Sequence, residues 1–297
     1  MNSIFDIINV PLGYLFKWIY FLVGNYGWTI ILFTIVTKFI LFPLTLKQQK
    51  SMKKTQAIQP QLAKLQEKYK YDQEKLSQET MKLYKESGVN PMGGCLPLLI
   101  QFPIIIALYN IIRKPMSYVL MLSSDAITTI SERITGTATE FVRINQIDLA
   151  NKMGGAMDKI SEFIGSGELI NFDFFGFNLS VTPSIEFITQ NWMYAFVPII
   201  AGLTTYLQSY VMTKMNGTGA QGDNPAASSM KTMNVIFPFM TAWFAVTLPA
   251  GLALYWIVSN IFQIAQTFIM NKFMKADAPA IEEGTPHFRE RAKKKKK

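Results

Sequence analysis

One lysine, Lys38, stands alone in a stretch that carries no other charged residue from position 18 to position 46. A charged side chain near the centre of a bilayer costs about 2.5–3.5 kcal/mol on insertion scales, and such residues usually serve a function. Thr34 lies four residues earlier, and side chains at this spacing share one face of a helix. An isolated cation beside a hydroxyl is suited to attracting an acidic group by its charge, without covalent chemistry.

The ammonium group of Lys38 needs either water or a route to the membrane surface. The lysine lies about 12 Å from the nearer end of its predicted helix, and its side chain covers roughly half of that distance. The predicted membrane crossings contain no Asp or Glu that could pair with it. We therefore favour a water-filled cavity inside the membrane, and snorkelling of the side chain to the interface is the alternative.

Amide side chains in the other apolar stretches support this cavity. Gln101, Gln208, Asn260 and Gln263 each lie inside a predicted crossing. Taken singly, each of them is expected to hold two helices together through a hydrogen bond. Together with an unpaired lysine, they predict a hydrophilic groove that several helices share.

The composition of the 297-residue chain argues against most enzyme chemistry. Only 16% of the residues are charged and 49% are hydrophobic, which is unusual for a soluble domain. A single Cys excludes an internal disulfide framework and Cys-rich metal sites, and the single His, His287, argues against a His-based triad or metal site. The crossings carry no paired carboxylates, and no phosphate-binding loop of the Gly-x-x-x-x-Gly-Lys-Ser/Thr type is present. We expect no enzyme activity, no cofactor and no metal.

Stretches without charged residues must position the polar side chains. About 20 apolar residues span the hydrocarbon core of a bilayer, and residues 232–271 span roughly two such cores, with Pro249-Ala250-Gly251 near the middle. We predict an all-α integral membrane protein with five transmembrane helices around a hydrophilic groove. The predicted segments are an outer interfacial helix (1–26), transmembrane helices (27–46, 89–112, 192–213, 232–248 and 251–271), a cytoplasmic basic helical hairpin (47–88), an extracytoplasmic region (113–191), a cytoplasmic loop (214–231) and a basic cytoplasmic tail (272–297).

Basic residues in the connections indicate the orientation, because they tend to stay in the cytoplasm. The hairpin at 47–88 holds ten basic and five acidic residues, and the tail from 272 holds nine and four. We therefore predict that the N-terminus lies outside and the C-terminus inside. Residues 1–26 lack the basic start and the small-residue cleavage site of a signal peptide, and their apolar residues recur at spacings of three and four. This pattern favours a helix in the outer interface, with a sixth crossing as the alternative.

The polar segments contain recognisable local patterns. In the hairpin, residues 70–73 predict a turn, with Asp72 as the N-cap of the second helix and Gly88 at its end. In the outer region, residues 127–134 and 156–164 are predicted to be helical. Residues 169–181 alternate in part, which predicts either a short strand or a segment at the membrane interface. The loop at 214–231 is rich in Gly and Asn and predicts a flexible connection.

Two long motifs resemble one family. They are VNPMGGCLPLLIQFP at residues 89–103 and PAGLALYWIVSN at residues 249–260, and shorter matches include FPLT at residues 42–45. With these motifs, the sequence is similar to the YidC/Oxa family of membrane protein insertases, across the predicted crossings and the basic hairpin. The resemblance is weak across residues 115–190, a stretch that is longer than the usual outer loop of the family.

The resemblance implies which residues form the site. Members have a groove that opens to the cytoplasm and to lipid and is closed to the outside, with a cation, usually Arg, in the first core helix. Here Lys38 occupies that position, which keeps the charge but loses the bidentate geometry of a guanidinium. Thr34 matches a threonine of the groove one turn earlier. The remaining matches are polar and aromatic groove positions at Gln208 and Trp256, and positions along the substrate path at Ile105 and Phe244.

The resemblance also implies a function without enzyme chemistry. Such a protein is an insertase and chaperone that accepts nascent membrane proteins in a positively charged groove and releases their transmembrane segments into the lipid bilayer. The expected location is the cell membrane, as a multi-pass protein, of a Gram-positive-type bacterium. The hairpin and the lysines from Lys293 to Lys297 are expected to contact the ribosome, and the Sec translocon is a further candidate partner.

Two other functions fit the residues alone. A small-solute transporter or channel with an intramembrane cationic site would also need Lys38, but the chain shows no duplicated half-segments of the kind many transporters have. A scaffold that merely holds other membrane proteins together would tolerate substitution of Lys38.

Overall fold

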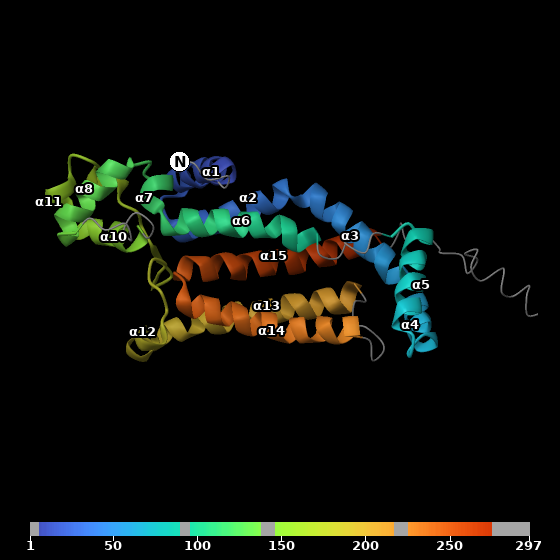
Figure 1. Ribbon diagram of the computed structural model, residues 1–297. Helices are drawn as coiled ribbons and strands as arrows, with labels where there is room; N and C mark the ends of the chain where they lie inside the picture. Colours follow the sequence, from blue (N-terminus) through green and yellow to red (C-terminus); the bar gives the residue numbers. More distant parts are fainter. Residues whose placement is uncertain (1–5, 90–95, 138–145, 217–224, 275–297) are drawn as a thin grey trace, which may run out of the picture.

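The computed structural model describes residues 6–89, 96–137, 146–216 and 225–274, which are mostly helical. α15 lies between α13 and α2 and packs against both, while α14 packs mainly against α13. Lys38, on α2, therefore belongs to a bundle in which α15 is the central helix. The long helices that run roughly along one direction are α2 (Tyr26–Ile40), α6 (Leu96–Arg113), α13 (Phe196–Asn216), α14 (Pro225–Thr247) and α15 (Ala250–Met274), and α3 (Phe42–Ala57) continues from α2 at an angle (Figure 1).

Length and composition qualify some of these helices as membrane crossings. Trp192–Met215 and Ala250–Phe273 are long and apolar enough to span a bilayer, and α2 with α3 forms a bent pair that qualifies as one further span. Within the described residues, Phe102–Arg113 and Val235–Thr247 are apolar but shorter. The structure therefore supports two or three crossings, and the number five remains a prediction.

The predicted crossing at 27–46 is divided into two helices in the structure. α2 ends at Ile40, α3 begins at Phe42, and the two axes differ by 60°. Pro43 explains the break, because it has no amide hydrogen for the carbonyl four residues earlier and its ring crowds that carbonyl. A proline in or at the end of a crossing frees a backbone carbonyl and permits such a bend.

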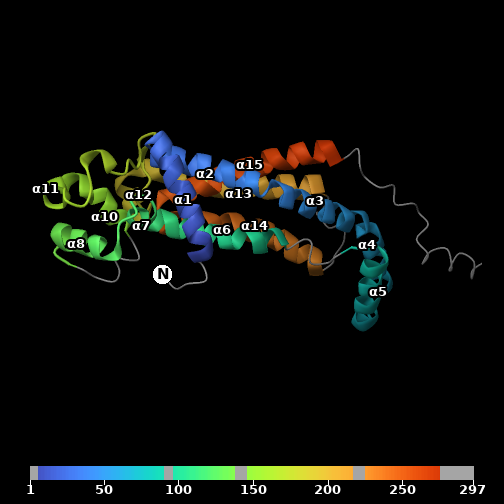
Figure 2. The ribbon, with the colours of Figure 1, turned by 90° about the horizontal axis from the view of Figure 1, so that it is seen from above.

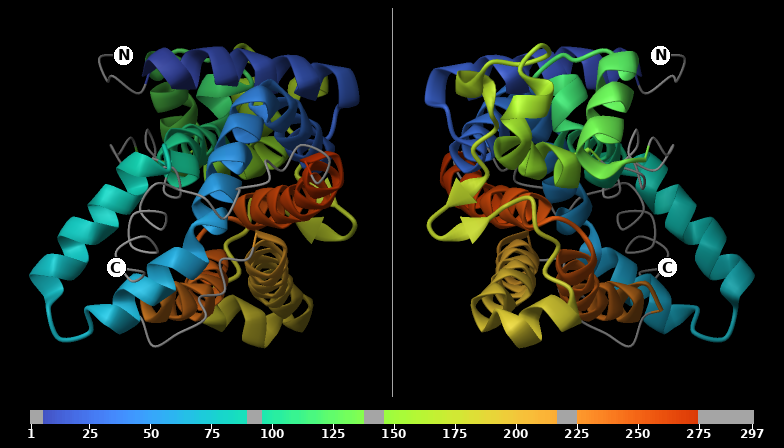
Figure 3. Two further views of the ribbon diagram at one scale, coloured as in Figure 1. Left: turned by 90° about the vertical axis from the view of Figure 1, so that its right-hand side faces the viewer. Right: turned by 90° about the vertical axis from the view of Figure 1, so that its left-hand side faces the viewer.

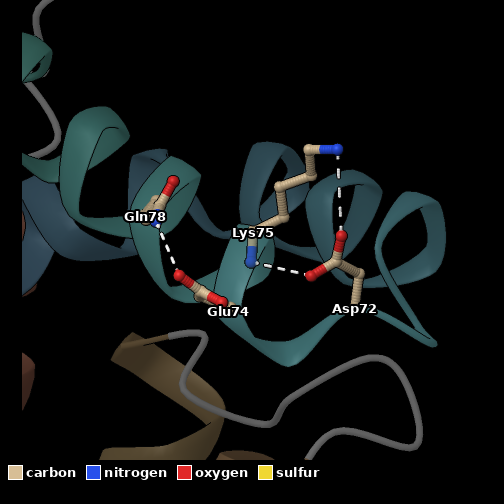
Figure 4. Close-up of polar contacts among 4 residues, drawn as sticks. All are labelled: Asp72, Glu74, Lys75 and Gln78. Carbon is tan, nitrogen blue, oxygen red and sulfur yellow. Dashed lines mark hydrogen bonds and ion pairs between the residues drawn. The ribbon is translucent and has the colours of Figure 1, made fainter.

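The basic hairpin forms as predicted from its turn residues, with helices α4 (Gln59–Lys68) and α5 (Gln73–Glu86). Asp72 is the N-cap of α5: its Oδ1 accepts a hydrogen bond from the Lys75 amide at 3.0 Å, while Lys75 Nζ lies 3.9 Å from Oδ2 (Figure 4). Gly88 has a φ of +59°, which glycine adopts at low cost, and α5 ends just before it. The hairpin projects from the end of α3, away from the other long helices (Figures 1 and 2).

The N-terminal helix α1 (Asp6–Val23) lies across α2 and α6 and does not run along them (Figures 2 and 3). Its inner face is anchored by Phe16, which is fully buried with its ring centroid 5.3 Å from that of Tyr26 and 5.4 Å from that of Phe33. Its other face exposes large apolar side chains, including Trp18 and Leu22. This crosswise placement agrees with an interfacial helix better than with a sixth crossing.

The outer region is a small folded unit of short elements and not an extended loop. Its buried residues, such as Ile130, Met153 and Ile160, belong to the same hydrophobic core as Phe16 and Tyr26. The predicted helix at 127–134 is present as α8, whereas the one at 156–164 is reduced to a few residues of η2 and α11. The elements are α7 (Pro115–Tyr118), α8 (Ser124–Thr135), α10 (Ile147–Lys152), η2 (Met153–Ala156), α11 (Met157–Ile160), η3 (Ser166–Glu168), α12 (Ile185–Gln190) and η4 (Trp192–Ala195).

A short antiparallel hairpin replaces the single strand predicted within 169–181. Strand β1 (Asp173–Phe174) pairs with β2 (Phe177–Asn178), with Phe174 opposite Phe177. The segment that contains this hairpin joins the ends of two long helices. The Tyr26 amide of α2 donates to the carbonyl of Asn171 at 2.9 Å, and the Gly251 amide of α15 donates to the carbonyl of Leu179 at 3.0 Å.

The predicted flexible loop at 214–231 is shorter in the structure. α13 continues to Asn216 and α14 begins at Pro225, so helix covers much of the segment that was predicted to be loop. Proline is favoured at the first position of a helix because its fixed φ suits the helix and its missing amide hydrogen is not needed there. Residues 217–224 and the tail from 275 lie outside the described residues.

Candidate functional site

Lys38 lies in the last turn of α2 and is buried, with 9% of its surface exposed. Thr34 and Thr37 on the same helix are buried too, and each hydroxyl donates to a backbone carbonyl one turn earlier, Thr34 Oγ1 to Ile30 at 2.7 Å and Thr37 Oγ1 to Phe33 at 2.8 Å. The hydroxyl oxygens therefore keep lone pairs that can accept hydrogen bonds. Lys38 thus stands next to buried hydroxyl groups, as its spacing from Thr34 predicted.

No carboxylate neutralises Lys38 within the part of the chain that the structure describes. The ion pairs found there join Lys75 to Asp72 and Arg133 to Glu162, both outside the bundle. An ammonium that is buried without an acidic partner gains stability from water or from a carboxylate that arrives with another molecule. A negatively charged group that came close to Lys38 would therefore be bound favourably at this point of α2.

Buried polar side chains on α15 lie at the level of Lys38. The ring of Phe39, the next residue on α2, is 5.6 Å from that of Phe262 on α15, which fixes how the two helices align. Ser259 and Gln266 lie within about one turn of Phe262, and both are buried. The bundle thus holds hydroxyl and amide groups close to the height of the cation.

The predicted amide residues have different roles in the structure. Asn260 donates through Nδ2 to Thr205 Oγ1 at 2.9 Å and to Thr204 Oγ1 at 3.3 Å, so it joins α15 to α13. Gln208 Nε2 contacts the sulfur of Met212 on the same helix at 2.8 Å, and a thioether is a weak acceptor. Asn260 is therefore a structural link, while among the described residues Gln208 contacts only this weak acceptor through its amide nitrogen.

Phe244, predicted for the substrate path, and Trp256, predicted for the groove, meet on neighbouring helices. The rings of Phe244 on α14 and Trp256 on α15 are 6.1 Å apart, and Phe244 is 40% exposed. Ile105 on α6 and Trp256 both pack against the main core and are only partly buried. The side chain of Gln101, also on α6, lies outside the described part of the structure.

A second group of buried polar residues was missed by the sequence reasoning. Gln49 on α3 and Gln266 and Asn271 on α15 are nearly fully buried, and α3 contacts α15. Each has one side-chain atom without a hydrogen-bond partner: Oε1 of Gln49, Nε2 of Gln266 and Nδ2 of Asn271. The sequence of α15 could have revealed this polar face. Its polar residues recur mostly three or four positions apart, which places them on one side of a helix: 260, 263, 266, 267 and 271.

These three residues are called the amide layer below. Buried polar atoms in proteins are nearly always paired with protein groups or with water. The unpaired atoms of the amide layer include an acceptor and two donors, so the layer can bind water or a peptide backbone. Gln49 lies on α3, which follows α2 toward the basic hairpin, while Gln266 and Asn271 lie in the last third of α15.

No group of three or more His, Cys, Asp or Glu side chains gathers among the described residues in a way that could hold a metal ion. The arrangement can attract an anionic group, solvate polar atoms inside an apolar bundle and present aromatic surface beside them. Such features define a polytopic helical membrane protein with a cationic, polar interior.

Comparisons with known proteins give the family. The model of the family described as "60Kd inner membrane protein" matches residues 18–277. The chain is 35% identical to the membrane protein insertase YidC of Clostridium perfringens over 83% of its own length and 79% of that relative. It is 32% identical to the insertase YidC 2 of Bacillus anthracis, covering 88% of this chain and 78% of the relative. This chain therefore belongs to the YidC family of 60Kd inner membrane proteins.

Other relatives are longer than the part that matches. The chain is 34% identical to the YidC of Wolinella succinogenes over 90% of its own length but covers only 37% of that protein. A crystal structure of an active YidC insertase with its first transmembrane domain resolved is similar over 90% of this chain and 47% of the solved chain, with 26% identity and a TM-score of 0.50. The helical core is therefore the part that all these proteins share.

Proposed function

We propose that this chain is a membrane protein insertase that receives nascent membrane proteins in a positively charged groove and releases their transmembrane segments into lipid. The observation that carries the proposal is the buried Lys38, which has no acidic partner in the described structure. Membership of the YidC family supports the function, because relatives covered to nearly four fifths of their length are named membrane protein insertases.

The first step of the proposed mechanism is electrostatic. A polar tail that must cross the membrane often carries an acidic residue, and its carboxylate is attracted to the Lys38 ammonium. At about 4 Å and an effective dielectric constant of 20, such a pair gains about 4 kcal/mol. This gain is comparable to the cost of about 2.5–3.5 kcal/mol for a lone charge at that depth. The attraction to the cation thus offsets the cost of bringing the charged tail into the bundle, so no energy source such as a nucleotide is needed.

The amide layer and the hydroxyl groups reduce the cost for the backbone of the tail. An unpaired peptide group in an apolar medium costs several kcal/mol. The open donors on Gln266 and Asn271 and the open acceptor on Gln49 offer hydrogen bonds to water or to that backbone. We assign Gln208, and Gln101 on α6, to the same solvating role along the groove.

The final step is release into lipid. The apolar segment that follows the tail slides along Ile105, Phe244 and Trp256, which present partly exposed apolar surface on three helices. Each Leu, Ile, Phe or Val in a membrane helix contributes about 0.3–0.6 kcal/mol, so about 20 such residues contribute roughly 6–12 kcal/mol. This exceeds the attraction at Lys38 and drives the segment out of the groove.

The proposed topology places the hairpin and the tail in the cytoplasm and α1 with the outer region on the other side. The charge balance supports it, since the hairpin and the tail are the most basic segments. The basic hairpin projects beyond the bundle (Figure 1), which supports our proposal that it contacts the ribosome in this orientation. The Sec translocon is the second proposed partner. We propose a bacterial cell membrane of the Gram-positive type, which the Clostridium and Bacillus relatives support.

Reconstitution tests the function directly. The purified full chain in liposomes receives a single-spanning test protein with an acidic tail, and the assay measures the fraction of tail protected from added protease. We expect protection well above that in empty liposomes, and lower protection with the Lys38→Met chain. Equal protection in empty liposomes and in those with the chain would refute the proposal.

A further inference from the structure

The tip of the β1–β2 hairpin carries a residue that its backbone does not favour. The two strands are joined by Phe175 and Gly176, and both have positive φ, +50° and +82°. Two-residue turns of this kind favour Asn-Gly or Asp-Gly, because a bulky L-residue rarely adopts a positive φ. Gly176 suits its position, whereas Phe175 is strained there. Such an outlier points to a use for the side chain outside the turn.

Packing inside the protein does not explain Phe175 either. Its side chain is 79% exposed, and its ring meets only the edges of an aromatic cluster, 4.7 Å from Phe174 and 6.3 Å from Trp28 between centroids. Phe174 holds the hairpin in place instead, because its ring packs directly on Gly27 of α2, where a Cβ atom would collide with it. Phe175 is therefore presented outward by a hairpin that is firmly attached to α2.

The height of the hairpin along the bundle is that of a membrane interface. Trp28 lies in the first turn of α2 and is 48% exposed, and Trp192 lies at the start of the membrane-spanning segment Trp192–Met215 and is 69% exposed. Trp and other aromatic residues are enriched where membrane helices meet the lipid headgroups. Because Phe175 contacts Trp28, it lies at the level of this exposed tryptophan, beside the first turn of α2.

We propose that the β1–β2 hairpin is a lipid anchor, with Phe175 inserted between the headgroups and the acyl chains of the adjacent leaflet. The occupant is phospholipid, because the exposed aromatic surface continues that of the helix ends at Trp28 and Trp192. Strain in the turn is compensated by burial of the ring in lipid. The outer region thereby holds the bundle at a defined depth, since the segment with the hairpin is hydrogen-bonded to the ends of α2 and α15.

Spin labelling measures the depth of Phe175. The single native cysteine, Cys95, is replaced by serine, and Phe175→Cys carries a nitroxide in vesicles of phosphatidylcholine and phosphatidylglycerol. The matched control is a label at Asp158→Cys, an exposed position on α11 of the same outer region. We expect the ratio of relaxation by oxygen to relaxation by a water-soluble nickel chelate to be severalfold higher at 175 than at 158.

Two results overturn the proposal. Equal ratios at the two positions would place Phe175 in water, and protection of position 175 from both relaxants would show that a protein chain, such as a second copy, covers it. Phe175→Trp provides a second measurement that keeps an aromatic ring on the turn. Lipids brominated near the headgroup should quench the added fluorescence of this variant, and absence of quenching contradicts the anchor.

Discussion

Replacing Lys38 by methionine separates the charge of this residue from its packing. Methionine keeps an unbranched apolar stem of similar length and removes the ammonium. If the lysine is a lone buried cation, the substitution also removes a cost of about 2.5–3.5 kcal/mol. We therefore expect Lys38→Met to raise the thermal stability of the protein in detergent while it lowers insertion of acidic-tailed substrates.

The size of the loss follows from the distance between the charges. A carboxylate in direct contact at about 4 Å gains about 4 kcal/mol, and one separated by a water at about 6.5 Å gains about 2.5 kcal/mol. The second value corresponds to a roughly 70-fold change in rate. We expect Lys38→Met to slow insertion of an acidic-tailed substrate by about that factor and to leave a neutral-tailed substrate nearly unaffected.

The assay compares three substrates that differ only in the charge of the translocated tail. Protease protection is followed over time for acidic, neutral and basic tails with the native chain and with Lys38→Met, Lys38→Arg and Lys38→Glu. Arg should support the acidic tail, and Glu should prefer the basic one. Lys75→Met, in the exposed hairpin, is the control for loss of a lysine elsewhere. Equal insertion of the acidic tail by Lys38→Glu and the native chain would refute the electrostatic step, and equal loss for all tails would show that Lys38 has only a structural role.

Three further substitutions test the architecture. Asn260→Ala should lower stability by about 0.6–1.7 kcal/mol, seen as a lower Tm, because α15 loses its hydrogen bonds to α13. Asp72→Ala should cost α5 about 1 kcal/mol, so that its amides exchange hydrogen faster while those of α13 do not change. Gly27→Ala should force the Phe174 ring off α2, with faster exchange across β1 and β2; unchanged exchange there would contradict the packing.

The local arrangement around Lys38 could be predicted, because it depends on residues that are close together in the sequence. Lys38 and Thr34 share a helical face, and the absence of acids from the crossings indicates an unpaired cation. Asp72 was likewise identified as a cap, since capping depends on residues only three positions apart. Such features depend on neighbours in the sequence, which periodicity can reveal.

What could not be predicted depends on contacts between distant segments. The Tyr26 amide bonds to Asn171, and the main core combines α1 with short elements from the outer region. Apart from α8, which was predicted, the outer elements are too short to show a reliable period, so the packing of this region was missed. The amide layer was overlooked because Gln49 on α3 lies within residues 47–88, which were predicted to be a basic hairpin in the cytoplasm.

The first residues of α2 and α15 donate hydrogen bonds to the carbonyls of Asn171 and Leu179, so the two ends of the bundle are held differently. α2, which carries Lys38, and α15, which packs against it, are both hydrogen-bonded to the segment of the β1–β2 hairpin. We therefore expect these two helix ends to move together. At the other end, near the basic hairpin, the 60° break after α2 gives α3 a different direction. We therefore expect any widening of the interior to occur at the end of the bundle that carries the basic hairpin, and not at the end that is joined to the β1–β2 segment.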